Sequence, residues 1–201
     1  MIASVGFSLT SAPAPRVSAQ GSSSFTRIAV AADGTAGNQT SNESSISADG
    51  RFVAFTSAAT NLVPGDTNGT SDIFVRDTVL DTIERASVGP TGTQGSTSYA
   101  PAISADGRYV AFTSTGAGLI PGDTFTGTSL YMHDRQTGDN SRLSVSSDGA
   151  NGGLESQVPS FSGDARYVAY SSRASNLVPS DTNGTWDVFV RDRVEATTTR
   201  V

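Results

Sequence analysis

Two almost identical segments carry the side chains that could bind a metal ion. Residues 65–77 read GDTNGTSDIFVRD and residues 180–192 read SDTNGTWDVFVRD. The first half of each segment is a polar loop that offers oxygen atoms at alternating positions. These candidate ligands are Asp66, Asn68, Thr70 (through its carbonyl) and Asp72 in the first segment, and Asp181, Asn183, Thr185 and Asp187 in the second. Hard oxygen ligands at this spacing suit Ca²⁺, which takes several oxygens in flexible geometry.

Two interpretations of these loops stay open. Either the side chains bind calcium, or they form an Asx-rich turn whose side chains bond their own backbone. The loops are shorter than a full calcium loop and lack its distal bidentate glutamate. A third, diverged segment at residues 122–134, GDTFTGTSLYMHD, keeps Asp123 but has Phe125 and Ser129 in place of the asparagine and the second aspartate. Calcium is therefore predicted only for the first and third units.

A catalytic site is not indicated by the remaining residues. His133 is the only histidine, and it stands where the related segments have Arg76 and Arg191, which makes it an ordinary strand residue. No serine lies in a Gly-x-Ser-x-Gly motif. The chain has no lysine and no cysteine, which excludes a Walker-type phosphate loop, thiolate zinc sites and a cysteine nucleophile. The sequence predicts a protein that is not an enzyme.

Trp186 is the loop residue best suited to contact a ligand or partner. It replaces Ser71 of the first segment and directly precedes Asp187. An exposed tryptophan can stack on a sugar ring or anchor a protein partner. The alternative is a tryptophan that folds over its own loop.

Charge and composition exclude two classes of partner. The net charge is −6 and the isoelectric point about 4.6, so the surface repels nucleic-acid phosphates. No segment approaches the roughly 18 apolar residues that a membrane span needs. We therefore expect neither nucleic-acid binding nor a membrane span.

Residues 1–24 are predicted to lie outside the fold, as a disordered leader or the remnant of an export signal. A short apolar run at residues 2–9 is followed by Val17-Ser18-Ala19, which fits a small-residue cleavage site. The positive region of a signal peptide is missing, since Arg16 is the first charged residue. This pattern favours an extracytoplasmic location: periplasmic, secreted or on the cell surface.

The two polar segments belong to a longer repeat. Residues 46–57 (ISADGRFVAFTS), 103–114 (ISADGRYVAFTS) and 161–172 (FSGDARYVAYSS) align, with their aspartates at positions 49, 106 and 164, a spacing of 57 and then 58 residues. The turn is Asp-Gly in the first two units, a preferred hairpin turn because Gly accepts positive φ. The third unit has Asp164-Ala165, so its turn is expected to differ or to carry strain.

Each unit reads as four strands. The first strands end at Ile46, Ile103 and Phe161; the second cover 51–57, 108–114 and 166–172; the third cover 72–77, 129–134 and 187–192; the fourth cover 82–88, 140–145 and 197–201. The second strands are mostly apolar, which predicts that both of their faces are covered. Four antiparallel strands with a constant period and no helix-period segment indicate the radial blades of a propeller rather than a β-sandwich. The loops after the second and fourth strands then share one face of the molecule, where binding is expected.

The repeated elements carry a family resemblance. ISADGRFVAF resembles the S-P-D-G-x-x-I-A-F core of TolB-like β-propeller repeats (WD40-like blades), and DIFVRD resembles the third strand of such blades. The resemblance covers residues 25–201 and implies an all-β propeller domain with blades at about 31–88, 89–145 and 146–201. It implies little about activity, because that family mixes binding scaffolds, regulatory domains of enzymes and surface proteins.

Three blades leave the ring incomplete, because propellers typically have four to eight. Residues 25–30, FTRIAV, match the fourth-strand pattern and are predicted as an extra outer strand. The chain is therefore expected to be a fragment of a larger propeller or half of a six-bladed homodimer.

We expect a non-enzymatic, extracytoplasmic binding or scaffolding module, stabilised by calcium, with a protein or carbohydrate partner on the loop face. The alternatives are a structural surface protein whose open blade edges join chains, and the propeller part of a larger hydrolase or lyase.

Overall fold

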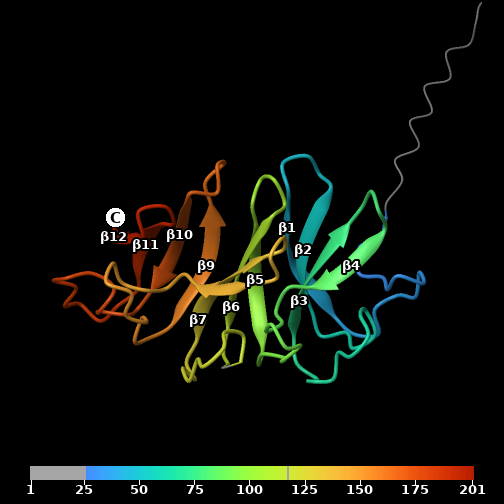
Figure 1. Ribbon diagram of the computed structural model, residues 1–201, viewed down its shortest axis with the longest axis horizontal. Coiled ribbons are helices and arrows are strands. Elements are labelled where there is room, and N and C mark those ends of the chain that lie inside the picture. Colours follow the sequence, from blue (N-terminus) through green and yellow to red (C-terminus); the bar gives the residue numbers. More distant parts are fainter. Residues whose placement is uncertain (1–25, 117) are drawn as a thin grey trace, which may run out of the picture.

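The computed structural model describes residues 26–201 except residue 117, and over these residues it contains three four-stranded antiparallel sheets. The sheets stand side by side along the long axis of the molecule (Figure 1). Each sheet is one blade, and the predicted three-blade β-propeller architecture is confirmed. The described residues contain no helix long and apolar enough to cross a membrane.

Blade 1 has the strand order β1 (Ser41–Ile46), β2 (Phe52–Ser57), β3 (Asp72–Asp77) and β4 (Thr82–Arg85). The central pair is in continuous register from Phe52↔Asp77 to Ser57↔Asp72. β2 and β3 are almost entirely buried, which for β2 agrees with the prediction from its apolar and β-branched residues.

Blade 2 repeats this arrangement with β5 (Ser98–Ile103), β6 (Tyr109–Ser114), β7 (Ser129–Asp134) and β8 (Asn140–Arg142). The fourth strands are shorter than the sequence predicts, because regular pairing stops at the arginine. One further backbone bond continues the ladder in each blade, from Leu143 N to the Leu130 carbonyl in blade 2. The serine that follows in blades 1 and 2 instead places its hydroxyl at the start of the third strand.

Blade 3 consists of β9 (Ser156–Phe161), β10 (Tyr167–Ser172), β11 (Asp187–Asp192) and β12 (Thr197–Arg200). Its second strand alternates between buried and more exposed residues, unlike the nearly continuous burial of β2 and β6. The reason is that only one face of β10 packs against a hydrophobic cluster, whereas Ile28 and Ala29 also pack against the outward face of blade 1. The prediction that the second strands are covered on both faces therefore holds for blades 1 and 2 and is wrong for blade 3.

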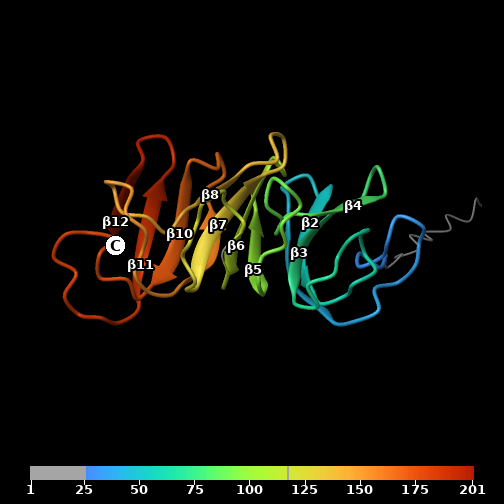
Figure 2. The ribbon, with the colours of Figure 1, turned by 60° about the horizontal axis from the view of Figure 1, so that its bottom comes forward.

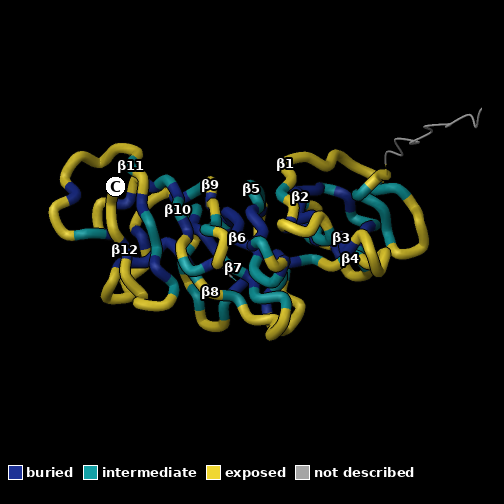
Figure 3. The backbone as a smooth tube through the Cα atoms, turned by 90° about the horizontal axis from the view of Figure 1, so that it is seen from above, coloured by how far each residue is buried: buried dark blue, intermediate teal, exposed yellow. Residues whose placement is uncertain are grey.

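The hydrophobic core lies between the blades. One cluster joins blades 1 and 2 through Ala54, Ile73, Val75, Ala86, Ile103, Val110, Phe112, Leu119 and Tyr131. A second joins blades 2 and 3 through Ala111, Leu130, Leu143, Val168, Tyr170, Ala174, Leu177 and Phe189. Figure 2 shows the facing sheets that enclose these clusters, and Figure 3 shows buried residues within and between the sheets and exposed loops at both ends.

The outward face of blade 1 carries a third cluster. It contains Phe55, Leu62 and Phe74, with Ile28 and Ala29 packed against it. The segment predicted as an extra outer strand thus lies on blade 1. Its described residues, 26–30, do not form the predicted strand; Val30 makes only an isolated bridge with Ala36. The predicted leader, residues 1–24, lies outside the described residues.

The three tight turns before the second strands share one geometry. Gly50 and Gly107 have φ of 75° and 73°, and Ala165 has φ of 57° in the third turn. The expectation of strain in the third unit agrees with this conformation, since a residue with a Cβ pays about 1–2 kcal/mol in the left-handed region.

Candidate functional site

The two long loops of each blade meet on one face, as predicted. The loop after β2 contacts the turn after β4 through Gln94, whose Oε1 accepts the backbone N–H groups of Thr67 and Asn68 at 3.0 and 2.8 Å. The amide of Asn68 donates to the Gly95 carbonyl at 3.1 Å. The polar loop predicted as a cation site is therefore fixed by the chain that leads into blade 2.

In blade 1, a buried arginine faces the two predicted carboxylate ligands. Nη1 of Arg85 lies 3.1 Å from Asp66 Oδ1 and 4.0 Å from Asp72 Oδ2, and the side chains are 8%, 2% and 0% exposed, respectively. Asp72 Oδ1 accepts a hydrogen bond from Ser87 Oγ at 2.6 Å. Burial raises the pKa of both aspartates, and the Arg85 charge opposes the rise. One guanidinium thus has to neutralise two buried carboxylates.

This cluster leaves several polar atoms without hydrogen bonds. Asp66 Oδ1, Thr70 Oγ1 and Asp72 Oδ2 are buried and have no hydrogen-bond partner. Nε and Nη1 of Arg85 are also without one, although Nη1 is within ion-pair distance of Asp66. A buried oxygen without a partner costs about 1–3 kcal/mol. The groups available to bind a cation are therefore two carboxylates and a hydroxyl. All of them offer oxygen atoms, and together with Arg85 they carry one uncompensated negative charge.

The asparagines of these loops form Asx turns. Asn68 Oδ1 accepts the backbone N–H of Thr70, and Asn183 Oδ1 that of Thr185, each at 3.2 Å. The described residues hold no group of three or more His, Asp or Glu side chains placed to bind one metal ion. A calcium ion here would need hydroxyl, carbonyl, amide or water oxygens to complete its shell. The oxygen donors fit calcium in type, and calcium stays a prediction.

Blade 3 repeats the cluster in a more open form. Nη1 of Arg200 lies 3.0 Å from Asp181 Oδ1 and 3.6 Å from Asp187 Oδ2. Arg200 is 36% exposed, compared with 8% for Arg85 and 5% for Arg142. Asp187 Oδ2 is buried and, like its counterpart Asp72 Oδ2, has no hydrogen-bond partner.

In blade 2, the corresponding polar groups form hydrogen bonds with one another. Arg142 contacts Asp123, donates to Ser129 Oγ at 2.6 Å and to the Tyr131 hydroxyl at 3.0 Å. The Tyr131 hydroxyl donates to Asp123 Oδ2 at 3.2 Å, and burial raises the pKa of this phenol to about 12, which keeps it a donor. The Phe125 ring lies 4.6 Å from the Arg142 guanidinium.

Three positions therefore change together between the blades. Blades 1 and 3 have Asn, Asp and Phe where blade 2 has Phe125, Ser129 and Tyr131. The blade 2 set removes one carboxylate and adds a phenol that bonds the remaining one. The blade 1 and 3 sets leave carboxylate oxygens unsatisfied.

The arginines of these clusters, Arg85, Arg142 and Arg200, are not among the site residues predicted from the sequence. Their signal was available in the fourth strands, which read ERASV, SRLSV and TRV. The arginine occupies the same position in each, and only the fold shows that this position faces the loop after the second strand.

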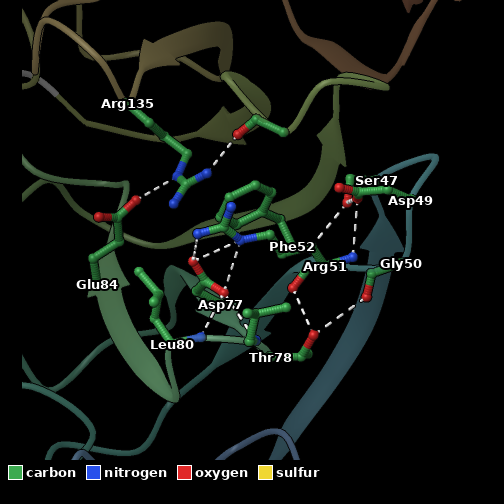
Figure 4. Close-up of polar contacts among 12 residues, drawn as sticks. Ser47, Asp49, Gly50, Arg51, Phe52, Asp77, Thr78, Leu80, Glu84 and Arg135 are labelled. Atoms are coloured by element: carbon green, nitrogen blue, oxygen red, sulfur yellow. Dashed lines mark hydrogen bonds and ion pairs between the residues drawn. The ribbon is translucent and has the colours of Figure 1, made fainter.

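The opposite face carries a second repeated cluster, shown for blade 1 in Figure 4. Arg51 binds Asp77 through Nε (3.0 Å to Oδ2) and Nη2 (2.7 Å to Oδ2). Asp77 Oδ1 also accepts the backbone N–H groups of Val79 and Leu80 at 2.9 and 3.0 Å. Asp77 therefore both caps the turn and pairs with Arg51, and the equivalent pairs are Arg108–Asp134 and Arg166–Asp192.

This cluster also joins neighbouring blades. Arg135 of blade 2 lies over the Phe52 ring of blade 1 at 4.2 Å and donates to the Gly107 carbonyl at 2.6 Å and to Glu84 (Figure 4). Arg193 of blade 3 covers Tyr109 of blade 2 in the same way, at 3.8 Å. These contacts are structural, because the arginines cover rings of the preceding blade and donate to turn carbonyls, Arg135 to Gly107 and Arg193 to Ala165.

Acid is expected to destabilise the protein through the aspartates of the Arg51–Asp77, Arg108–Asp134 and Arg166–Asp192 pairs, which we call the rim aspartates. Hydrogen bonds from the paired arginines lower the pKa of Asp77, Asp134 and Asp192, the last to about 2. A carboxyl whose pKa is lower in the folded state stabilises the fold above its unfolded pKa and loses that contribution as pH falls through the folded value. The urea midpoint should therefore fall between about pH 5 and pH 2.

The control is Asp192→Asn, which should be less stable at pH 7 and show a shallower acid slope. Asp66 and Asp72 act in the opposite sense, since their raised pKa favours the folded state at low pH. A urea midpoint that stays constant or rises as the pH falls would show that the effect of Asp66 and Asp72 on stability is at least as large as that of the rim aspartates.

His133 and Trp186 lie as their sequence positions suggest. His133 is buried on β7, and its Nδ1 is 2.9 Å from Asn140 Oδ1 on the adjacent strand, which places it in the blade rather than at a site. Trp186 is 43% exposed in the loop before β11. Its predicted role in ligand or partner contact stays a prediction.

Shallow grooves lie on the loop face at equivalent places in blades 1 and 3. The first, of 460 Å³, is lined by residues 31–33 and 60–65, and the second, of 510 Å³, by residues 146–148 and 175–180. Asn61 and Asn176 support them by donating to the Ala36 and Asn151 carbonyls at 2.9 and 2.8 Å. In blade 2, Gly89 lies against the Gly118 carbonyl at this place, where an added Cβ would come within 2.3 Å.

Comparison with solved structures supports the fold. The chain resembles the crystal structure of TolB from Acinetobacter baumannii (TM-score 0.52, 18% identity, 81% of this chain and 32% of that one). It also resembles the putative TolB from Agrobacterium tumefaciens (TM-score 0.55, 18% identity, 82% of this chain and 48% of that one). The chain thus spans about a third and about half of these two proteins, and it has the fold of a TolB-like β-propeller.

The same fold occurs in an enzyme. The β-propeller domain of the Trilobed protease from Pyrococcus furiosus matches with a TM-score of 0.50 and 13% identity, over 83% of this chain and 45% of that domain. No protein-family model and no curated protein matches the sequence. At these identities the likeness defines the architecture and leaves the activity to be argued from the loops.

Proposed function

We propose that the chain is a non-enzymatic propeller module that binds a partner on its loop face and whose blade 1 and blade 3 loops are stabilised by calcium. The observation that carries the calcium part is the contrast between blades. Asp66, Thr70 and Asp72 keep buried oxygens without hydrogen bonds, whereas Ser129 and Tyr131 close the same network in blade 2. A divalent cation would satisfy these oxygens and remove the excess negative charge.

Calcium is expected to raise the melting temperature, and EDTA to lower it. At a calcium concentration about 100 times the dissociation constant, binding stabilises the fold by about 2.7 kcal/mol. For a domain of this size each kcal/mol shifts the melting temperature by about 2–4 °C. Scanning calorimetry with calcium, magnesium and EDTA measures the shift.

The matched control gives blade 1 the residues that blade 2 has at the three differing positions. The triple variant Asn68→Phe, Asp72→Ser, Phe74→Tyr removes one carboxylate and supplies the phenol that blade 2 uses. We expect this variant to lose the blade 1 share of the calcium shift without losing stability in EDTA. If neither calcium nor EDTA changes the melting temperature of the wild-type chain, the calcium part of the proposal is wrong.

The loop face is the proposed binding surface because it carries the paired grooves and the exposed Trp186. A protein or carbohydrate partner fits these features, since an exposed indole can stack on a sugar ring or anchor a protein contact. Screening on a glycan array, with Trp186→Ala as the matched variant, tests the carbohydrate version. Binding that is unchanged in the variant would place the ligand elsewhere.

The proposed extracytoplasmic location rests on the Val17-Ser18-Ala19 pattern alone. Expression of the full chain followed by fractionation and N-terminal sequencing tests it. Cleavage after Ala19 in an exported fraction supports the proposal, and an uncleaved cytoplasmic product contradicts it.

A further inference from the structure

Blade 3 exposes the face that blades 1 and 2 bury. In blade 2 this face contributes Leu130 and Leu143 to the core, at 0% and 3% exposure. The same positions in blade 3 are Val188 and Val201, at 46% and 78% exposure. The equivalence follows from the backbone, because Val201 N donates to the Val188 carbonyl as Leu143 N does to Leu130.

Further apolar side chains extend this end face. Tyr167 corresponds to Phe52 and Tyr109, which are covered by arginines of the following blade. Tyr167 contacts only its neighbour Arg166 in this way among the described residues, and it is 39% exposed. Trp186 lies at the edge of the same blade, at the position whose carbonyl in blade 1 (Ser71) bonds the first strand of the next blade.

The other end of the molecule carries the complementary half. On blade 2, Ile103, Val110 and Phe112 face blade 1 and are at most 6% exposed. Their counterparts on the outward face of blade 1 are Ile46, Val53 and Phe55. Ile46 is 60% exposed, whereas Val53 and Phe55 are 9% and 4% exposed, and Ile28 and Ala29 pack against the cluster that contains Phe55. A groove of 350 Å³ lies along Val53 and Phe55. The two end faces stand at opposite ends of the row of blades (Figure 1).

We propose that a second copy of this chain docks head to tail, with blade 3 of one copy on blade 1 of the other. The chain already makes this interface twice, between blades 1 and 2 and between blades 2 and 3, from side chains at the same positions. Faces that differ at the two ends give a heterologous contact, which forms a ring where the rotation closes. Two copies would give six blades, within the usual range of four to eight.

The N-terminal segment occupies part of the docking face. Residues 28–30 follow the path of residues 143–145: Val30 N bonds the Ile28 carbonyl as Val145 N bonds Leu143, and Gly37 N bonds Ala29 as Gly152 N bonds Ser144. Ile28 therefore holds the place that Val201 of a docking copy would take. Arg27 and Ile28 compete with docking, and removing residues 1–28 should strengthen association.

Sedimentation velocity over a range of protein concentrations tests the proposal. Wild-type chain should associate, and Val188→Asp or Ile46→Asp should each weaken association by roughly tenfold or more, because a charge then lies in an apolar contact. Val194→Asp is the control, since Val194 is 68% exposed in the turn between β11 and β12. Both test residues are exposed, so circular dichroism should show unchanged folding.

The mixture of the two variants distinguishes this contact from a symmetric one. Val188→Asp keeps an intact blade 1 face and Ile46→Asp keeps an intact blade 3 face, so together they should recover one contact per pair. A wild-type chain that remains monomeric at every concentration, variants that associate like wild type, or a mixture without recovery would each overturn the proposal. None of these outcomes depends on whether calcium or a loop-face ligand binds.

Discussion

Replacing Gly107 by alanine should destabilise the protein more than the same substitution at Gly50. The two glycines occupy equivalent turns with nearly equal φ, 73° and 75°. An alanine at either position therefore costs about 1–2 kcal/mol, because its Cβ is placed in the left-handed region. The two positions differ in their surroundings. A Cβ on Gly50 meets no atom within 4 Å, whereas a Cβ on Gly107 would lie 2.1 Å from Cδ2 of Phe52.

The additional cost at Gly107 comes from the junction between blades 1 and 2. Phe52 would have to leave its place beneath Arg135, and such overpacking costs about 1–3 kcal/mol. Urea denaturation of both variants measures the difference. Because repeat proteins are stabilised by contacts between neighbouring units, we also expect Gly107→Ala to loosen blade 1 from blade 2, visible as faster amide exchange in blade 1.

A double-mutant cycle with Phe52→Ala identifies the cause. If the clash with the ring accounts for the excess, Gly107→Ala in the Phe52→Ala background should cost no more than Gly50→Ala in wild type. Equal effects of the two glycine substitutions in wild type would show that the turn conformation alone matters.

The fold could be predicted from the sequence because each blade repeats its local signals. The turn at Asp49 is read directly: its Oδ1 accepts bonds from the Ser47 hydroxyl and the Arg51 backbone, at 2.6 and 3.0 Å. The third strands have the same bounds in the sequence interpretation and in the structure. The exposure of Val188 could not be read in the same way, because DVFVRD is as apolar as DIFVRD and only the position at the end of the row decides burial.

The site was only half visible in the sequence. Asp66 and Asp72 stand close together in one loop, so their proximity could be predicted. In blade 1, Arg85 comes from β4 and reaches Asp66 in the loop after β2. In blade 2, the Tyr131 hydroxyl comes from β7 and reaches Asp123 in the loop after β6. Strand pairing across each sheet brings these residues to their loops. Whether a loop carboxylate is neutralised by arginine alone or by arginine and a cation therefore depends on contacts that local sequence patterns do not show.

Replacing Arg142 by methionine should be among the most destabilising changes in blade 2. Arg142 and Asp123 are 5% and 8% exposed. Removing the guanidinium leaves the Asp123 carboxylate buried without its charge partner, and breaking a buried pair in this way costs about 3–5 kcal/mol. Ser129 and the Phe125 ring lose their contacts to the same group. Chemical denaturation measures the loss, and Arg51→Met on the rim, where the arginine is 37% exposed, should cost less.

The double variant Arg142→Met, Asp123→Leu determines whether the charge pair or its packing matters. It removes both charges and fills the same space with apolar atoms, and buried ion pairs replaced in this way are often neutral or stabilising. We expect it to regain most of the stability lost in Arg142→Met. If it stays as unstable as the single variant, the cost lies in the lost hydrogen bonds to Ser129 and Tyr131. In that case those two hydroxyls would be what stabilises the blade 2 network. Blades 1 and 3 lack them, because they have an aspartate in place of Ser129 and a phenylalanine in place of Tyr131.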